Sequence, residues 1–157
     1  MTQSWLDAVF LHWRIPEAVA ATRMPPGVRP DTYDGSSWVG LIGFRLQETT
    51  ISTGPAIPYF GTFIEVNVRL YSREPSGRRG VVFLSMDASR LAFVMAARAA
   101  RLPYIWSRLS FRPRIEPGSD VAYSVHRFRH GPTSDFSVSP APGQEANDPL
   151  SIHLTAR

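Results

Sequence analysis

The sequence of 157 residues contains no cysteine and no lysine, since all 17 of its basic residues are arginine. Without cysteine the chain has no disulfide, no catalytic thiol and no thiolate ligand for a metal. Without lysine it has no side-chain amine that forms a Schiff base with a carbonyl compound. The lack of cysteine is also typical of a reducing compartment, so we expect a cytoplasmic protein.

Long hydrophobic runs and the common catalytic motifs are missing as well. No run approaches the ~18 apolar residues of a membrane-spanning helix, and the N-terminal residues lack the basic region and cleavage site of a secretory signal. The sequence has no phosphate-binding loop, dinucleotide fingerprint or nucleophile elbow. The histidines, which lack metal-ligand spacing, are His12, His126, His130 and His153. We therefore expect no membrane contact, no metal and no cofactor.

Chain-breaking residues are abundant by contrast. The 14 prolines and 11 glycines divide a sequence that is 43% hydrophobic into many short segments. This composition favours strands joined by turns over a bundle of long helices. A length of 157 residues corresponds to one domain, so we predict a single, mainly β domain of the α+β class over residues 1–157.

Local patterns predict where the elements lie. Strands are predicted at 9–15, 38–46, 63–71, 81–86, 104–115, 121–129 and 135–138. Helices are predicted after Pro16, at Asn147-Asp148-Pro149 and near 88–101, where a long and largely buried helix has Asp87 as its N-cap. Turn signals pair 63–71 with 81–86 and 104–115 with 121–129, both antiparallel.

The segment 63–71 (FIEVNVRLY) has the clearest alternation in the chain. It places Glu65, Asn67 and Arg69 on one face of a strand and apolar residues on the other. In an open sheet the polar face meets solvent, whereas in a closed barrel it lines the interior. Glu65 and Arg69 would then lie about 13 Å apart along the strand, a spacing that suits a small polar ligand.

Arginines are spread along the chain rather than clustered. The densest stretch places Arg108, Arg112 and Arg114 on one face of a predicted strand. Arginine is mostly exposed in proteins, so we expect a solvated outer face here and regard nucleic acid as an unlikely partner.

Three runs of the sequence resemble a known family. They are FLHWRIPEAVAATRMPPGVRPDTYDGSSWVGLIGF, FIEVNVRLYSR and GVVFLSMDASRLAFVMAARAARLPYIWSRL. They resemble the YqjF-like bacterial proteins, known as domain of unknown function 2071, and more distantly the acetoacetate decarboxylase barrel. The resemblance implies an antiparallel, cone-shaped β-barrel with a helix packed against it.

The distant resemblance also implies positions for site residues. It places a decarboxylase-like arginine at Arg14 and a pocket glutamate at Glu65. The nucleophilic lysine of the decarboxylase is replaced by Tyr104, which cannot form an imine, so decarboxylation by that route is excluded. We predict that the ligand-binding residues are Arg14, Glu65, Asn67, Arg69 and Tyr104.

These observations leave three functions open. The first is a barrel that binds a small anionic or carbonyl compound without Schiff-base chemistry, since arginine suits carboxylates. The second is an enzyme in which Glu65 is the general acid or base and Tyr104 donates to an oxyanion. The third is a structural or partner-binding module whose core is filled by Trp5, Trp13, Trp38 and Trp106.

The C-terminal part raises a separate expectation. Chains of the family continue for several tens of residues beyond the stretch that resembles PLSIHLTAR, and the continuation supplies closing strands. We therefore expect a barrel that lacks C-terminal strands, and either a homodimer whose interface includes residues 135–157 or a product that is poorly soluble when expressed alone.

Overall fold

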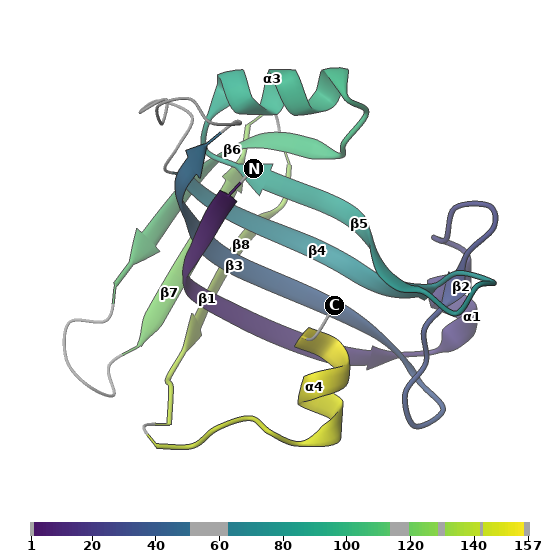
Figure 1. Cartoon of the computed structure of the whole chain (residues 1–157). Coiled ribbons are helices and arrows are strands. Elements are labelled where there is room, and N and C mark those ends of the chain that lie inside the picture. The colour runs from purple at the N-terminus through teal and green to yellow at the C-terminus, as the bar shows by residue number, and fades with distance from the viewer. Residues whose placement is uncertain (1, 51–62, 114–119, 129–130, 142, 156–157) are drawn as a thin grey trace.

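Strands form most of the protein and roll into a nearly closed, mixed β-barrel with few helices (Figure 1). The structure is a computed structural model, and it describes residues 2–50, 63–113, 120–128, 131–141 and 143–155. The strands are β1 Thr2–Ile15, β2 Arg29–Pro30, β3 Ser37–Thr50, β4 Phe63–Arg73, β5 Arg79–Ala88, β6 Tyr104–Arg112, β7 Val121–Arg127 and β8 Thr133–Val138. The helices are α1 Glu17–Ala21, α3 Leu91–Ala99 and α4 Pro149–Thr155. The predicted mainly β fold is confirmed.

The strands form one sheet in the order β1-β3-β4-β5-β6-β7-β8, and the short strand β2 pairs with β4. Every pairing is antiparallel except that of β5 with β6, where Met86–Ala88 run parallel to Tyr104–Trp106. The mostly antiparallel barrel expected from the sequence therefore has one parallel step, between β5 and β6. The reason is the connection through α3, because a helical crossover returns the chain in its original direction.

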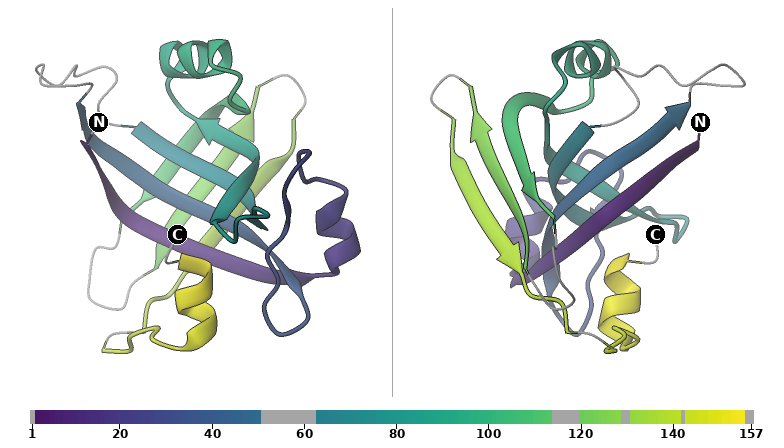
Figure 2. Two further views of the ribbon diagram at one scale, coloured as in Figure 1. Left: turned by 45° about the vertical axis from the view of Figure 1, so that its right-hand side comes forward. Right: turned by 90° about the vertical axis from the view of Figure 1, so that its left-hand side faces the viewer.

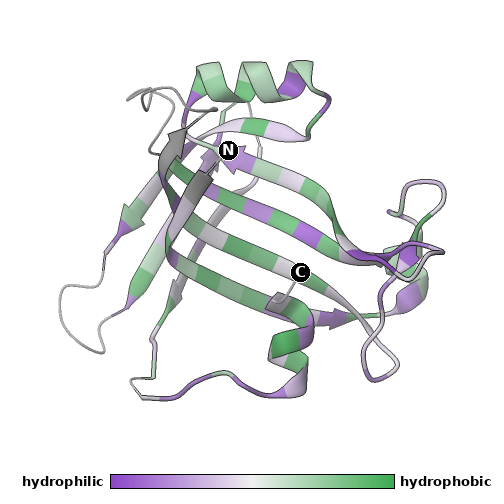
Figure 3. Cartoon of the chain, in the orientation of Figure 1, coloured by the Kyte–Doolittle hydropathy of each residue, from purple (hydrophilic) through white to green (hydrophobic). Residues whose placement is uncertain are grey.

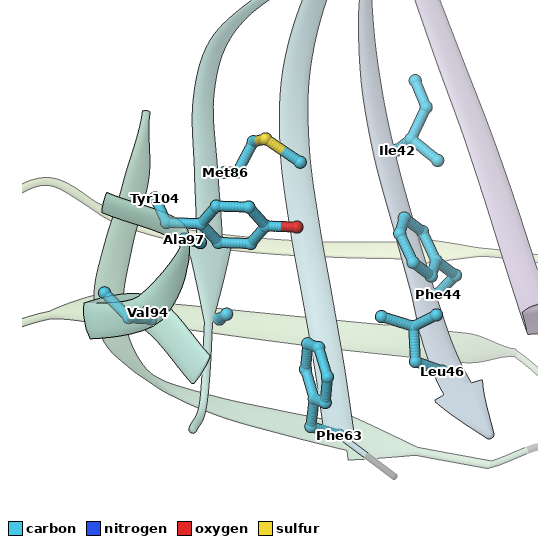
Figure 4. Packing of buried hydrophobic residues seen from close by; sticks show 9 residues of the cluster. Ile42, Phe44, Leu46, Phe63, Met86, Val94, Ala97 and Tyr104 are labelled. Atoms are coloured by element: carbon cyan, nitrogen blue, oxygen red, sulfur yellow. The ribbon is translucent and has the colours of Figure 1, made fainter. Parts of the chain in front are cut away.

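Each face of the central strands has its own hydrophobic cluster. Inside the barrel, residues from three strands pack together: Val9 of β1, Val66 of β4, and Val121, Tyr123 and Val125 of β7. On the opposite face of β3 and β4 a second cluster lies beneath α3 (Figure 4). Its buried members are Ile42, Phe44, Leu46, Phe63, Met86, Ala88, Val94, Ala97 and Tyr104. Strand β4 is therefore covered on both faces.

Helices α3 and α4 lie at opposite ends of the barrel (Figures 1 and 2). Leu154 of α4 packs against Trp38 and Tyr71 in a third buried cluster. The predicted helix start at residues 147–149 is confirmed, since the Asp148 carboxylate accepts hydrogen bonds from the backbone N–H groups of Leu150 and Ser151. Among the described helices, none combines the length and the apolar character needed to cross a membrane.

Helix α3 corrects the helix predicted near 88–101. It covers only Leu91–Ala99, and its N-cap is Arg90, which makes no side-chain capping bond. Asp87 instead lies in β5, so its predicted capping role is wrong. The helix is also less buried than predicted, because Met95 is 61% exposed.

Asp87 is buried in a network that joins three strands. Its Oδ1 accepts hydrogen bonds from the Ser107 hydroxyl at 2.6 Å and from Arg127 Nε at 2.8 Å. Its Oδ2 accepts a third from an Arg127 terminal nitrogen at 2.7 Å. A carboxylate held by β6 and β7 in this way is unavailable to cap a helix.

The tryptophans are also more exposed than predicted. Trp38 is buried as expected, but Trp5, Trp13 and Trp106 are between 40% and 51% exposed. Trp5 stacks on Phe44 with ring centroids 4.2 Å apart, so it covers the second cluster from outside. A large aromatic ring shields a core when only one of its faces is buried, and the sequence does not distinguish this from full burial.

Strand β6 ends before Pro113, as expected from the missing amide hydrogen of proline. Residues 114 and 115 of the predicted strand, and residue 129 of the next one, lie outside the described residues. Arg108 and Arg112 are exposed on β6, and Arg114 lies outside the described residues too.

Protein stability distinguishes the two roles considered for Asp87, a helix N-cap and a buried partner of Arg127. Asp87→Asn should lower the free energy of unfolding by about 3 kcal/mol, because Arg127 would keep a largely buried charge without its partner. As a helix N-cap the same change would cost almost nothing, since asparagine caps as well as aspartate. Urea unfolding at neutral pH measures the difference.

The matched control is Glu74→Gln, which breaks the exposed ion pair with Arg78. It should leave the urea midpoint nearly unchanged. Equal midpoints for both variants and the unmodified chain would contradict the structural role of Asp87.

Candidate functional site

Four polar side chains lie in a row on one face of β4. Glu65, Asn67, Arg69 and Tyr71 are here called the polar stripe, and each is at most 6% exposed. Figure 3 shows polar and apolar residues alternating along this strand. The alternation identified in the sequence therefore defines the stripe. The face is covered by the protein, so the reading as a solvent-exposed surface is wrong.

Glu65 lies at the α3 end of the stripe and has two hydrogen-bond donors. Tyr104 donates its hydroxyl to Oε2 at 2.9 Å, and Asn67 donates its amide to Oε1 at 3.3 Å. Tyr104 comes from the start of β6, where the parallel pairing sets it beside Met86. In Figure 4 its ring extends from β6 toward β4. The crossover through α3 thus delivers the second residue of the Glu65 centre.

Burial controls the ionisation of this pair. It raises the pKa of Glu65 to about 7, although the hydrogen bonds from Tyr104 and Asn67 act to lower it. Burial and the neighbouring Glu65 both raise the pKa of Tyr104 far above its ordinary value. Tyr104 therefore keeps its proton at neutral pH, while Glu65 exchanges one there. A carboxyl with this property is typical of a proton-transfer or proton-sensitive binding group.

Asn67 contributes an unsatisfied group to the same centre. Its Oδ1 is buried and has no hydrogen-bond partner among the residues that the structure describes. An unsatisfied buried acceptor costs about 1–3 kcal/mol, so such groups in native proteins usually face a water molecule or a ligand. The Glu65 centre thus offers one free acceptor beside a carboxyl that carries a proton.

At the other end of the stripe, Tyr71 connects Arg69 to His12 of β1. The Tyr71 hydroxyl lies 2.6 Å from His12 Nε2 and accepts a hydrogen bond from Arg69 Nε at 3.3 Å. Burial, together with the charge of Arg69, lowers the pKa of His12 to about 4. His12 is therefore neutral at pH 7, and its Nε2 shares a hydrogen bond with the Tyr71 hydroxyl.

Of the residues predicted for the site, the structure brings Glu65, Asn67, Arg69 and Tyr104 to one face but leaves Arg14 apart. Arg14 is half exposed, binds Asp34 at 3.0 Å and lies over the Trp38 ring. Asp34 belongs to a turn whose position relative to β1 is not visible in the sequence.

Sequence reasoning missed His12 and Tyr71. Tyr71 continues the alternation of Glu65, Asn67 and Arg69, so a longer reading of the pattern would have included it. His12 carries no comparable signal, because its place opposite β4 depends on how β1 pairs with β3.

Two cavities lie away from the stripe. One of about 310 Å³ lies where β1 approaches β7 and β8, next to Asp7, Val9 and Val138. Another of about 240 Å³ lies on β7 and β8 near Ser124. Within the described ranges, no three histidine, aspartate or glutamate side chains are grouped closely enough to hold a metal ion.

A model of the family DUF2071, described as an uncharacterized conserved protein, matches residues 2–157. The uncharacterized protein YqjF of Bacillus subtilis (strain 168) is 28% identical over 162 residues, a match that covers 100% of this chain and 65% of YqjF. The chain thus spans about two thirds of the length of this curated relative. The family resemblance found in the sequence is confirmed.

Solved structures agree with the expected fold. The enduracididine biosynthesis enzyme MppR complexed with pyruvate aligns with a TM-score of 0.69 at 17% identity, covering 93% of this chain and 58% of MppR. An acetoacetate decarboxylase-like enzyme from Sphingomonas wittichii RW1 aligns with a TM-score of 0.66 at 17% identity, covering 90% of this chain and 57% of that enzyme. The acetoacetate decarboxylase-like fold is therefore confirmed.

The shifted pKa values at the two ends of the stripe predict opposite pH dependences of stability. Between pH 4.5 and about 7 the folded chain keeps a proton on Glu65 that the unfolded chain loses. Glu65 therefore lowers the free energy of unfolding as the pH rises, by about 3 kcal/mol over this range. Between about pH 4 and 6.5 the unfolded chain binds a proton on His12 that the folded chain lacks, so His12 raises stability with pH.

The pH ranges in which Glu65 and His12 change the stability overlap, so their opposite contributions partly cancel in the unmodified protein. Variants that remove one of the two groups separate these contributions. Urea unfolding between pH 4.5 and 8 should show stability rising with pH in Glu65→Gln and falling with pH in His12→Gln. Parallel profiles for the unmodified chain and Glu65→Gln would mean that Glu65 titrates as an ordinary glutamate.

Proposed function

The chain belongs to DUF2071, a family of uncharacterized conserved proteins, and we propose that its Glu65 centre binds a small carbonyl or carboxylic compound. The observation that carries this proposal is a buried carboxyl with a pKa near 7 beside the unsatisfied Oδ1 of Asn67. Protonated Glu65 donates a hydrogen bond to a carbonyl oxygen, and Asn67 Oδ1 accepts one from a hydroxyl or amide of the ligand. A ligand that supplies both would satisfy the centre.

The similar structures support this class of ligand. MppR has been captured with pyruvate and with the condensation product of pyruvate and imidazole 4-carboxaldehyde, and the other neighbour is acetoacetate decarboxylase-like. These proteins are 17% identical to this chain, so they support only the kind of compound that this fold accommodates.

Binding in this proposal is non-covalent. The chain has no lysine, and Tyr104, which occupies the position of the decarboxylase nucleophile by resemblance, donates a hydrogen bond to Glu65. A hydroxyl with this partner and a strongly raised pKa orients the carboxyl and does not attack a carbonyl. Glu65, Asn67 and Tyr104 therefore recognise the compound through hydrogen bonds.

A second candidate function is an enzyme that uses Glu65 as a general acid or base. The observation that favours it is the same pKa of about 7, at which a carboxyl gives and takes protons with comparable ease. In the forward direction Glu65 takes a proton from the carbon next to a carbonyl, and the electron pair of that C–H bond moves toward the carbonyl oxygen. The Tyr104 hydroxyl, which donates to Glu65 in the structure, then turns its one proton from the newly protonated Glu65 to the oxyanion and stabilises it.

Binding of pyruvate tests the proposed function. Isothermal titration calorimetry at pH 6 and pH 8 should show tighter binding at pH 6, where Glu65 is protonated and neutral. Glu65→Gln should remove this pH dependence, and Tyr104→Phe should weaken binding by about tenfold through loss of the bond that orients the carboxyl. Glu74→Gln, which changes an exposed glutamate, is the matched control and should behave like the unmodified chain.

Equal affinities for the unmodified chain and Glu65→Gln at both pH values would contradict the assignment of the centre. If pyruvate binds and turns over, the product identifies the enzyme and the pH profile of the rate should follow the titration of Glu65.

Borohydride trapping tests the non-covalent mode. Incubation with acetoacetate and borohydride should leave the mass of every internal residue unchanged, because only the α-amino group is able to form an imine. Peptide mass spectrometry that locates a reduced adduct inside the chain would contradict the proposal.

A further inference from the structure

Arg69 is a buried cation that has no acidic partner among the described residues. It is 6% exposed, yet no aspartate or glutamate of the described residues forms an ion pair with it. Its one hydrogen bond within the described structure runs from Nε to the Tyr71 hydroxyl, so its terminal nitrogens remain available. Buried charges in proteins are normally paired, which makes this arginine exceptional.

The sheet provides a cradle for this group. Gly40 of β3 pairs with His12 of β1 on one side and with Arg69 of β4 on the other. A Cβ atom on Gly40 would lie 3.0 Å from the Tyr71 hydroxyl and 3.2 Å from the His12 ring. The missing side chain is therefore what lets Tyr71 reach across β3 and join His12 to Arg69.

The described groups around Arg69 bring no negative charge to it. The guanidinium lies 5.5 Å from the centre of the Phe10 ring and 5.3 Å from that of Tyr71. The Tyr71 hydroxyl accepts from Arg69 Nε and shares a hydrogen bond with neutral His12, and neither of these groups brings a negative charge. Two aromatic faces and a neutral hydroxyl orient the cation without neutralising it.

We propose that Arg69, held between Phe10 and Tyr71 over the Gly40 cradle, is an anion subsite that binds a carboxylate. This subsite rests on the proposed function for the identity of the ligand. It adds that the end of the ligand far from Glu65 carries the negative charge. Glu65 and Arg69 are four residues apart on one strand, about 13 Å between Cα atoms. A ligand that contacts both groups is thus a small acid whose carboxylate and carbonyl lie at opposite ends, whereas pyruvate, in which the two groups are adjacent, contacts one of them at a time.

His12 provides a readout that does not involve Glu65. The Arg69 charge contributes to its low pKa, so an anion on Arg69 should raise that pKa. The probe is trifluoroacetate, which stays ionised throughout the His12 titration, and trifluoroacetamide is its neutral counterpart. Binding to the full chain is followed by 19F NMR at pH 7, and His12 by its imidazole proton signals, assigned with His12→Gln.

We expect trifluoroacetate to bind and to raise the pKa of His12 by about one unit, and trifluoroacetamide to do neither. Arg69→Met should weaken trifluoroacetate binding by about tenfold or more and raise the pKa of His12 without any probe. Arg108→Met removes the same charge from an exposed position and should change binding by less than about twofold. Gly40→Ala should weaken binding while every charge is retained.

Sulfate distinguishes a carboxylate from a free inorganic anion. Displacement of trifluoroacetate by pyruvate but not by equal sulfate supports the carboxylate, and displacement by sulfate at lower concentration overturns it. If Arg69→Met does not fold, trifluoroacetate binding is measured with Arg69→Gln instead, and the two fluorinated probes are compared on the unmodified chain. Equal binding of both probes, or equal losses in Arg69→Met and Arg108→Met, overturns the subsite. If trifluoroacetate binds as expected but pyruvate binds equally well to the unmodified chain and to Glu65→Gln, the Glu65 proposal is overturned and the Arg69 subsite stands.

Discussion

The burial of β4 on both faces is the constraint on which the rest of the structure depends. One face packs Val66 into the barrel interior, and the other carries the polar stripe between the clusters under α3 and α4. A strand covered on one side tolerates polar residues at no cost, whereas here every polar group must find a partner inside the protein. The partners that the structure supplies are Tyr104 for Glu65 and Tyr71 for Arg69. What they leave unsatisfied is what a ligand has to supply.

The two ends of the stripe differ in how burial acts on them. Burial raises the pKa of Glu65 to about 7, so Glu65 keeps its proton in weakly acidic solution. Burial lowers the pKa of His12 to about 4, so His12 stays neutral there. Arg69 has no such option, because a guanidinium keeps its proton at any physiological pH. The stripe therefore presents a neutral or weakly acidic group at one end and a fixed positive charge at the other. This polarity along one strand is the basis for reading the ligand as a small acid with a carbonyl or hydroxyl group.

The sequence predicted those features that depend on local patterns. The alternation in residues 63–71 located Glu65, Asn67 and Arg69 on one face, and Asp148 before Pro149 located α4. It failed where an assignment depends on partners distant in the chain. Asp87 precedes a helix and so resembles an N-cap, but Arg127, 40 residues later, binds its carboxylate. Gly40 lies between His12 and Arg69 only because β1, β3 and β4 pair in this order, and that pairing joins residues distant in the chain.

The central claim is that Glu65 is a buried carboxyl that titrates near neutral pH. Carbon-13 NMR of the protein labelled at the glutamate carboxyl carbon, with Glu65→Gln to assign the signal, measures this directly. The account predicts a titration midpoint of about 7 for Glu65. A midpoint near the ordinary glutamate value of about 4.3 would contradict it, because it would show that water or a fixed positive charge reaches the carboxyl in the folded protein.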